Sequence, residues 1–288
     1  MAFRQVTSLQ VESAAGSDLK KFRSSYTSLD RQLCSFRSEN TTMRKLILRL
    51  RKLAFCAFRP SLWRFLLKGV APTIDHVKPL GSLNVSMVLD VGANRGQFAL
   101  MARKMWPKSD IICFEPLPEP SRLLTELFSG SNVKILQTAL SDKAGVMQMY
   151  VTESDDSSSL LQIGINQQRI SNTIVNHVEN AVAVDTLDNV LVDVSIPEGA
   201  LLKIDVQGTE ENVLRGASAS LAKLTWVYVE CSYIELYIGQ SLASGIVLLM
   251  DQNGFELSGV FNQAFDRQIG AVQADFLFTR RVVRLNKN

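Results

Sequence analysis

Short apolar runs alternate with segments of helical periodicity along most of the chain after residue 84. We expect helices at 96–105, 119–128, 209–222 and 241–252, and strands at 86–91, 111–115, 133–139, 146–153, 182–191 (a short strand and turn), 200–206 and 225–231. Continuous apolar strands that alternate with helices are typical of a parallel sheet covered on both faces. The pattern therefore predicts an α/β fold with a mostly parallel, doubly wound sheet, to which a final pair (255–261 and 274–280) adds one antiparallel edge strand.

The charge distribution divides the chain into three parts. Residues 1–68 hold 14 Lys and Arg against 4 Asp and Glu, whereas the remainder is acidic, although the net charge of the whole chain is +3. A stretch with two prolines and two glycines, 69–83, reads as a linker. We therefore expect a basic, partly helical N-terminal arm (1–68), a linker (69–83) and one domain (84–288).

The arm carries two patterns, and each leaves alternatives open. Apolar residues at alternating steps of three and four run through 19–57, with Asn40 at a core position; they predict either a self-pairing coiled coil and hence a homodimer, or amphipathic helices packed on the body. The segment 43–69 mixes basic with apolar residues. This pattern suits a helix in peripheral contact with an anionic inner membrane surface, or one that packs on the domain 84–288. No nucleic-acid-binding module is recognisable, so we expect no nucleic acid partner.

The cysteines and histidines give no metal-binding pattern. Cys34, Cys56, Cys113 and Cys231 form no CxxC pair, and with only two histidines no zinc spacing exists, so we expect no metal. Cys113 and Cys231 lie in apolar runs and resemble buried small hydrophobes. Unpaired cysteines of this kind favour a reducing, cytoplasmic location.

The stretch VLDVGANRGQF (88–98) places an acid and two glycines at the end of the first predicted strand. Ligands of open α/β sheets bind at the carboxyl ends of the strands, where Asp90 lies. Gly92 allows a tight turn, and Gly96 opens the next helix, whose N-terminal N–H groups then face the crevice. Glu115 ends the second strand, where a carboxylate commonly accepts the ribose hydroxyls of a nucleoside.

The nucleoside is not expected to be a dinucleotide. Asn94 stands where the second glycine of a G-x-G-x-x-G motif would be, and no phosphate-binding G-x-x-x-x-G-K loop is present. The acid at position 90 would repel a phosphate, but it suits a ligand with an ammonium and a sulfonium group. S-adenosylmethionine has both, together with a ribose for Glu115. Asp142, after the third strand, is a candidate acceptor for the adenine amino group.

On these residues the sequence resembles the FkbM family of S-adenosylmethionine-dependent methyltransferases. The matching segments, within about 84–280, are DVGANRGQF (90–98), FEPLPE (114–119), ALSDKAG (139–145), SSSL (157–160), VDTLD (184–188), LKIDVQGTEENVLRGA (202–217) and VYVECSY (227–233). The resemblance implies a class I, Rossmann-like methyltransferase fold. It also implies methylation of oxygen, often on a sugar, glycan or natural-product hydroxyl.

The resemblance also assigns roles to individual residues. Asp90, Gly92, Asn94 and Gly96 would line the methionine end of the cofactor, Glu115 would hold its ribose, and Ser141 and Asp142 would face its adenine. The KIDVQGTE segment would contribute the methyl-transfer residues. The long polar stretch 154–180 departs from the family pattern and is expected to shape the choice of acceptor.

A hydroxyl acceptor must lose its proton as the new bond forms, so a nearby base helps. Asp205, at the end of the strand 200–206, is the first candidate, and a structural carboxylate is its alternative. Glu230, at the end of the next strand, is a rival base or a ligand for the acceptor hydroxyl. His177, in the polar stretch, is a third candidate that could equally be a solvated loop residue.

Several polar residues near these candidates have an ordinary structural explanation. Glu210 and Glu211 fall in the first turn of a helix, where acidic residues cap and balance the helix dipole. Lys203, inside an apolar strand, is expected to pair with a carboxylate. Ser157, Ser158 and Ser159 either bind acceptor groups or belong to a polar loop.

Two other functions fit parts of the pattern. A nicotinamide-dependent oxidoreductase would use a similar sheet, although the missing middle glycine weighs against it. A non-catalytic module, tethered by the arm and retaining a nucleoside pocket, is the second alternative. The intact set of strand-end carboxylates favours the methyltransferase.

Overall fold

The computed structural model describes residues 62–152, 157–171 and 178–281. The chain divides into two compact units, one of residues 1–83 and 96–109 and the other of 84–95 and 110–288. Nearly all of the predicted arm lies outside the described residues, including the heptad stretch 19–57 and residues 43–61 of the amphipathic stretch. The coiled coil, the membrane contact and the domain boundaries therefore stay predictions.

The described part of the first unit contains short helices. They are α3 (Trp63–Leu67), the 3-10 helix η2 (Ile74–His76), α4 (Val77–Leu80) and the longer α5 (Gln97–Met105). The Trp106 indole N–H donates to the carbonyl of Leu83 at 3.0 Å, and the rings of His76 and Phe98 meet edge to face. These contacts join the segment before strand β1 to the helix after it.

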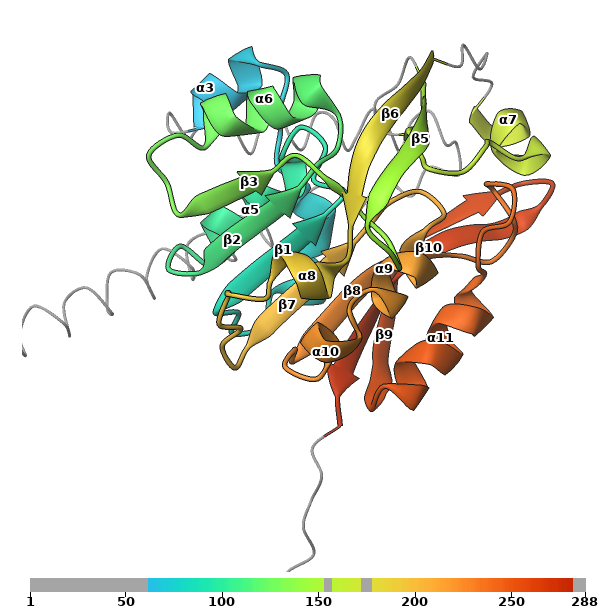
Figure 1. Ribbon diagram of the computed structural model, residues 1–288. Helices are drawn as coiled ribbons and strands as arrows, with labels where there is room; N and C mark the ends of the chain where they lie inside the picture. The colour runs from blue at the N-terminus through green and yellow to red at the C-terminus, as the bar shows by residue number, and fades with distance from the viewer. Residues whose placement is uncertain (1–61, 153–156, 172–177, 282–288) are drawn as a thin grey trace, which may run out of the picture. The chain divides into compact units, whose positions relative to one another are not determined.

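The second unit is built on a seven-stranded sheet with the order β3-β2-β1-β7-β8-β10-β9 (Figure 1). The strands are β1 (Met87–Val91), β2 (Asp110–Phe114), β3 (Val133–Leu136), β7 (Ala200–Ile204), β8 (Trp226–Ser232), β9 (Phe255–Asp266) and β10 (Gly270–Arg280). The first five are parallel, and β10 runs antiparallel to both β8 and β9. The predicted mostly parallel α/β sheet is confirmed, with β10 as its antiparallel strand and β9 at the edge.

One face of this sheet carries the main hydrophobic core. Side chains from α8 (Leu187–Val190), α9 (Glu210–Arg215), α10 (Ser218–Leu221) and α11 (Ala243–Gln252) pack on alternate residues of the strands. Leu89, Leu202 and Val229 are examples of these strand residues, and all three are fully buried. Burial of such a continuous apolar face fixes the strand register, because a one-residue shift would turn these side chains to the opposite face.

A second, three-stranded sheet holds the middle of the chain. It consists of β4 (Ala139–Leu140), β5 (Gly145–Val151) and β6 (Val178–Asp185), and β6 lies between the other two. β5, which corresponds to the predicted strand 146–153, pairs antiparallel with β6. Helix α7 (Ile165–Ser171) lies in the connection between them, and α6 (Pro118–Leu127) follows β2.

Two predicted elements differ from the structure. The apolar run 133–139 is not one strand, because β3 ends at Leu136 and β4 pairs with β6 in the other sheet. The predicted helix 209–222 is two helices separated at Gly216. A Cβ at Gly216 would lie 2.0 Å from the carbonyl oxygen of Ser141, so the backbone there packs too closely for any side chain.

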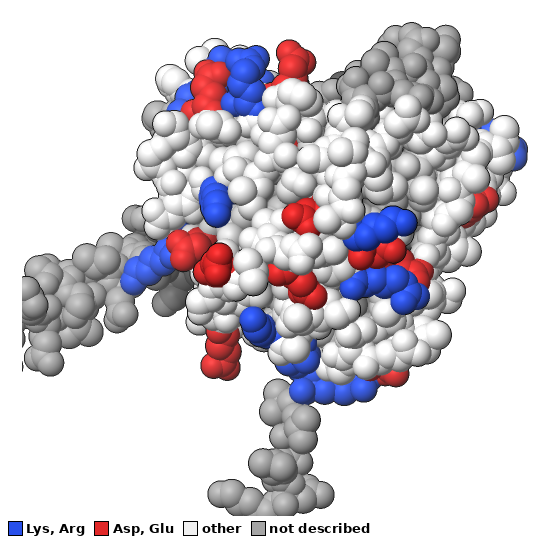
Figure 2. Space-filling view, in the orientation of Figure 1, with Lys and Arg blue, Asp and Glu red and all other residues white. Residues whose placement is uncertain are grey.

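Acidic and basic side chains are interspersed in small groups on the face shown in Figure 2. Arg215 pairs with Glu211 one turn earlier on α9, and Arg281 pairs with Asp251. Within the described ranges, no helix has the length and apolar character needed to cross a membrane.

Candidate functional site

The sheet register brings four predicted site positions into one row. Val91 lies beside both Phe114 and Ile204, and Ile204 lies beside Val229. The residues that follow these four are Gly92, Glu115, Asp205 and Glu230. They therefore occupy equivalent positions across four neighbouring strands: Gly92, Glu115 and Asp205 directly follow β1, β2 and β7, and Glu230 lies near the end of β8, two residues before Ser232. The carboxyl edge of such a sheet is its ligand-binding edge.

The turn after β1 is tight because it touches two neighbouring strand ends. Gly92 has a φ of +74°, and the amides of Gly92 and Ala93 both donate to the carbonyl of Phe114 at 3.1 Å. A Cβ on Gly92 would lie 1.9 Å from the backbone oxygen of Asp205. Glycine is therefore required at position 92 by its φ and by the approach of the β7 end. Asn94 and Gly96 continue the turn with φ values of +48° and +90°.

Asp90 and Lys203 form a buried ion pair between neighbouring strands. They are register partners in β1 and β7, the Asp90 side chain is fully buried, and Lys203 Nζ lies 3.1 Å from its Oδ1. Nζ also donates to the carbonyl of Gly92 at 3.0 Å. Burial alone would lower the pKa of Lys203, but the charges of Asp90 and Asp205 outweigh it and raise that pKa. The expected ion pair of Lys203 is thus present, and it ties the glycine turn to β7.

The carboxylate of Glu115 is buried, and its oxygens can still accept further hydrogen bonds. Its Oε2 accepts the backbone N–H of Asn94, and its Oε1 accepts that of Leu117, both at 2.8 Å. A carboxylate offers about four lone-pair sites, so roughly one per oxygen remains for a ligand. Burial raises the pKa of Glu115 to about 7, against the lowering effect of these two N–H groups.

Ser141 and Asp142 directly follow β4, in the smaller sheet. The amide of Ser141 donates to the carbonyl of Asp185, and its hydroxyl donates to Asp142 at 3.1 Å. Asn212 Nδ2, from α9, also donates to Asp142 Oδ1 at 3.4 Å. Asp142 is exposed, whereas Ser141 is buried. Their proposed role toward adenine stays a prediction.

The far end of the row joins two carboxylates through one amide. Gln207 Nε2 donates to Asp205 Oδ1 at 2.8 Å and to Glu230 Oε2 at 3.0 Å. The phenol of Tyr237 donates to Gln207 Oε1 at 2.9 Å, and Gln273 donates to Glu230 Oε1. The two base candidates therefore belong to one connected polar cluster.

The two carboxylates have different surroundings. The Asp205 side chain is 38% exposed, and its Oδ2 lies 3.7 Å from Lys203 Nζ. Burial, together with the negative charges of Asp205, Asp275 and Glu210, raises the pKa of Glu230 well above its usual value. This raised pKa strengthens Glu230 as a proton acceptor.

The turn that carries Gln207 is held by two side chains, those of Glu210 and Ser159. Glu210 folds back to accept the amides of Gly208 at 2.9 Å and Val206 at 3.3 Å; both amides precede α9, so this side chain holds the turn and does not cap the helix. Burial raises the pKa of this carboxyl to about 7. Ser159 Oγ donates to the carbonyl of Gln207 at 2.6 Å, so one serine of the SSSL segment binds the turn.

Sequence reasoning missed Gln207 and Tyr237 as members of the site. Gln207 lies within the KIDVQGTE segment, but nothing in its residue type signals that it joins two carboxylates. Tyr237 reaches the cluster from the loop after β8, where it packs with Ile163, Leu236 and Val272. His177 lies outside the described residues, so its role stays a prediction.

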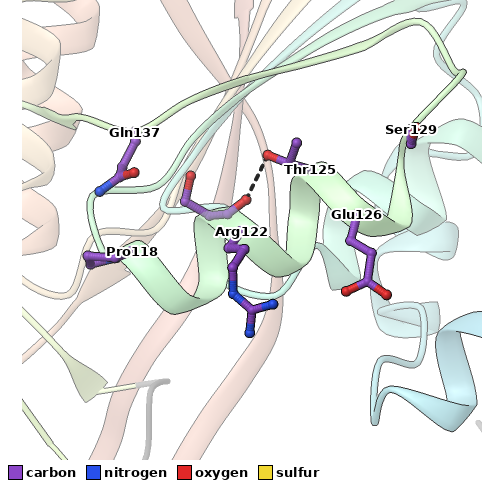
Figure 3. Close-up of a pocket in the computed structure, with 7 residues that line it drawn as sticks. Pro118, Arg122, Thr125, Glu126, Ser129 and Gln137 are labelled. Atoms are coloured by element: carbon purple, nitrogen blue, oxygen red, sulfur yellow. Dashed lines mark hydrogen bonds between the residues drawn. The ribbon is translucent and has the colours of Figure 1, made fainter.

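A hollow of about 680 Å³ lies along α6. It is lined by Pro118, Ser121, Arg122, Thr125, Glu126, Ser129 and Gln137. Figure 3 shows most of these side chains along one side of α6, with Gln137 on the segment after β3. None of them is a predicted site residue, so the candidate site is defined by the strand ends and not by this hollow.

The strand order and the strand-end row define a class I methyltransferase fold. The family model described as the methyltransferase FkbM domain matches residues 90–257, which is more than half of the chain. The chain therefore belongs to the FkbM methyltransferase family, and its methyl donor is S-adenosylmethionine.

The chain is similar to three named methyltransferases over part of their lengths. The chain is 25% identical over 190 residues to 2-O-methyltransferase NoeI of Sinorhizobium fredii, a match that covers 64% of this chain and 77% of that protein. It is 29% identical to methyltransferase sdnD of Sordaria araneosa, over 64% of this chain and 79% of that protein. It is 27% identical to 31-O-demethyl-FK506 methyltransferase FkbM of Streptomyces tacrolimicus, over 59% and 72% respectively.

Proposed function

We propose that this methyltransferase acts on oxygen and transfers the methyl group to a hydroxyl of a glycan or natural-product acceptor. The observation that carries the proposal is the pair of carboxylates, Asp205 and Glu230, linked at the end of the row opposite Glu115. A hydroxyl needs a base as it reacts, and this pair supplies one. Two relatives whose printed names describe O-methylation support the same acceptor atom.

The donor is proposed to bind at the β1 and β2 ends of the row. The residues fit it, because Glu115 retains about one acceptor site on each oxygen, enough for the two ribose hydroxyls. The left-handed turn at Gly92, Asn94 and Gly96 would line its methionine end, and Ser141 with Asp142 its adenine. Asp90, buried against Lys203, acts in this proposal by holding the turn in place.

When bound, S-adenosylmethionine supplies a methyl carbon attached to a sulfonium. The acceptor oxygen would take this methyl group, and the electron pair of the broken carbon–sulfur bond would stay on the sulfur. The hydroxyl proton passes to a carboxylate, for which we favour Glu230. Asp205 already has an ion-pair partner in Lys203, whereas the raised pKa of Glu230 strengthens that group as a proton acceptor.

The test is transfer of labelled methyl from S-adenosylmethionine to a panel of sugars, oligosaccharides and polyketide alcohols. We expect a product methyl ether that resists mild alkali, which separates it from a methyl ester. Glu230→Gln should lower kcat by about 100-fold or more, in the range of general-base removal, and Asp205→Asn by less. Labelling that reaches only amines or carboxylates would contradict the proposal.

The two alternatives drawn from the sequence lose their support. An oxidoreductase shares the sheet, but the chain belongs to a methyltransferase family. A non-catalytic module would not need the connected pair of carboxylates beside the donor end.

A further inference from the structure

Gln207 has a backbone conformation that few residues of its type adopt. Its φ is +58°, in the left-handed region, where a non-glycine residue costs about 1 kcal/mol or more. The conformation persists because Ser159 holds its carbonyl and Glu210 holds the next amide. Left-handed residues of this kind concentrate at functional sites.

The side-chain amide of Gln207 is fully engaged. Its two N–H groups donate to Asp205 and Glu230, and its oxygen accepts from Tyr237. The opposite amide orientation would place the oxygen between two carboxylates, so the chemistry of the partners fixes the assignment. One side chain therefore connects the ends of β7 and β8 with the loop after β8.

We propose that Gln207 is a positioning residue that orients Asp205 and Glu230, so that one of them takes the acceptor proton. The inference rests on the proposed function and adds to it the group that arranges the base. Because each donated N–H stabilises the charged form of a carboxylate, the amide allows two acids on neighbouring strands to lie close together.

Other charged groups also act on Glu230, and of these only Asp205 itself loses a hydrogen bond when Gln207 is substituted. The negative groups are Asp205 after β7, Glu210 on α9 and Asp275, which is the register partner of Glu230 on β10. The positive charge is Lys203. Gln273 donates to the other Glu230 oxygen at 2.6 Å, so removal of the Gln207 amide leaves that oxygen bound.

The experiment is a pH titration of the full chain with S-adenosylhomocysteine bound and glutamate side-chain carboxyls labelled with ¹³C. The Glu230 signal is assigned by its loss in Glu230→Gln. We expect Gln207→Met to raise the Glu230 midpoint by about one pH unit, because the charged form loses a hydrogen bond. Gln207→Glu should raise it further, because it adds a negative charge.

Two further variants and one control keep the test decisive. Gln207→Asn retains an amide and a residue type that tolerates left-handed backbone, but it is one carbon too short to span both acids. Tyr237→Phe removes the hydroxyl that holds the amide and should give a smaller upward shift. Gln252→Glu, at the exposed end of α11, is the matched charge control and should leave the midpoint unchanged.

The functional readout uses whichever acceptor the panel yields. We expect kcat of Gln207→Met to fall about tenfold or more, with the acid limb of its pH profile moved upward by the same shift and KM for S-adenosylmethionine unchanged. Hydroxyl methylation combined with a Glu230 midpoint that does not move in any Gln207 variant would overturn the role of Gln207 alone. Donor binding without transfer to any hydroxyl would overturn the proposed function, and the role of Gln207 with it.

Discussion

The two ends of the strand-end row hold their carboxylates in different ways. At the β1 and β2 end, Asp90 and Glu115 are buried and are bound by a lysine or by backbone amides. At the β7 and β8 end, Asp205 and Glu230 are bound by the side chains of Gln207 and Gln273, and Asp205 is 38% exposed.

In the proposed function, this difference separates the end assigned to the donor from the end assigned to the acceptor. Backbone amides keep their positions when side chains change, so the donor end is fixed by the fold. The acceptor end depends on side chains, including Tyr237 from a loop and Ser159 from the segment after β5. One donor can thus be kept while the acceptor pocket changes, as expected of a fold that hosts many substrates.

The largest effect on stability is expected at the donor end. Lys203→Met leaves Asp90 buried without its partner and should lower the free energy of unfolding by about 3–5 kcal/mol. Arg215→Met, which removes an exposed ion pair with Glu211, should cost about 1 kcal/mol or less. Denaturant unfolding measures both, and the double variant Asp90→Leu/Lys203→Met should recover most of the loss. Equal losses of unfolding free energy in Lys203→Met and Arg215→Met would contradict the expected difference between the buried and the exposed ion pair.

The turn at Gly92 gives the next largest effect. Gly92 and Gly130 have nearly equal φ values, +74° and +73°, but a Cβ meets the Asp205 backbone only at position 92. Gly92→Ala should cost about 3 kcal/mol or more, from backbone strain and overlap together, and Gly130→Ala about 1 kcal/mol from strain alone. Thermal unfolding of the pair tests this, and similar melting temperatures would show that the turn can move away from β7.

In the proposed donor site, the raised pKa of Glu115 should make donor binding depend on pH. A ribose hydroxyl would bind the charged carboxylate, so binding should lower a pKa of about 7 and release protons. Affinity for S-adenosylhomocysteine should therefore rise about tenfold from pH 6 to pH 8, and level off above the free-state pKa. Glu115→Gln should remove the part of the pH dependence of affinity that comes from this carboxyl group. Calorimetry in buffers of different ionisation enthalpy measures the proton release, and an unchanged slope in the variant would refute the linkage.

The smallest expected effect lies beside the acceptor turn. The Thr209 hydroxyl is buried and has no hydrogen-bond partner among the described residues. Thr209→Val keeps the shape and removes this unsatisfied group, so it should be neutral or stabilising by about 1 kcal/mol. A loss of stability, measured by denaturant unfolding, would indicate a partner such as a bound water.

The sequence predicts the row of strand-end residues better than the residue that links two of them, for a physical reason. Gly92, Glu115 and Asp205 follow apolar runs whose strand register is set by burial, so their place at one sheet edge can be worked out. Gln207 depends on a left-handed turn that is held by Ser159, which is 48 residues earlier in the chain. Such long-range contacts leave no local pattern.

Two predicted elements differ from the structure because tertiary contacts override the local sequence pattern. The apolar run 133–139 predicts one strand. In the structure the amide of Thr138 donates to the carbonyl of Leu136, and the chain passes from the seven-stranded sheet to the three-stranded one. The helix 209–222 breaks where Gly216 packs against Ser141. Neither contact can be read from the apolar periodicity alone.

The most direct measurement compares S-adenosylhomocysteine binding by Glu115→Ala and Glu230→Gln, using calorimetry on variants whose melting shows that they are folded. A donor at the β1 and β2 end predicts that Glu115→Ala weakens binding by about 30-fold or more, the scale of two lost hydrogen bonds to a charged group, while Glu230→Gln binds like the wild-type chain. Unchanged affinity in Glu115→Ala, or an equal loss in Glu230→Gln, would contradict the division of the row into donor and acceptor ends.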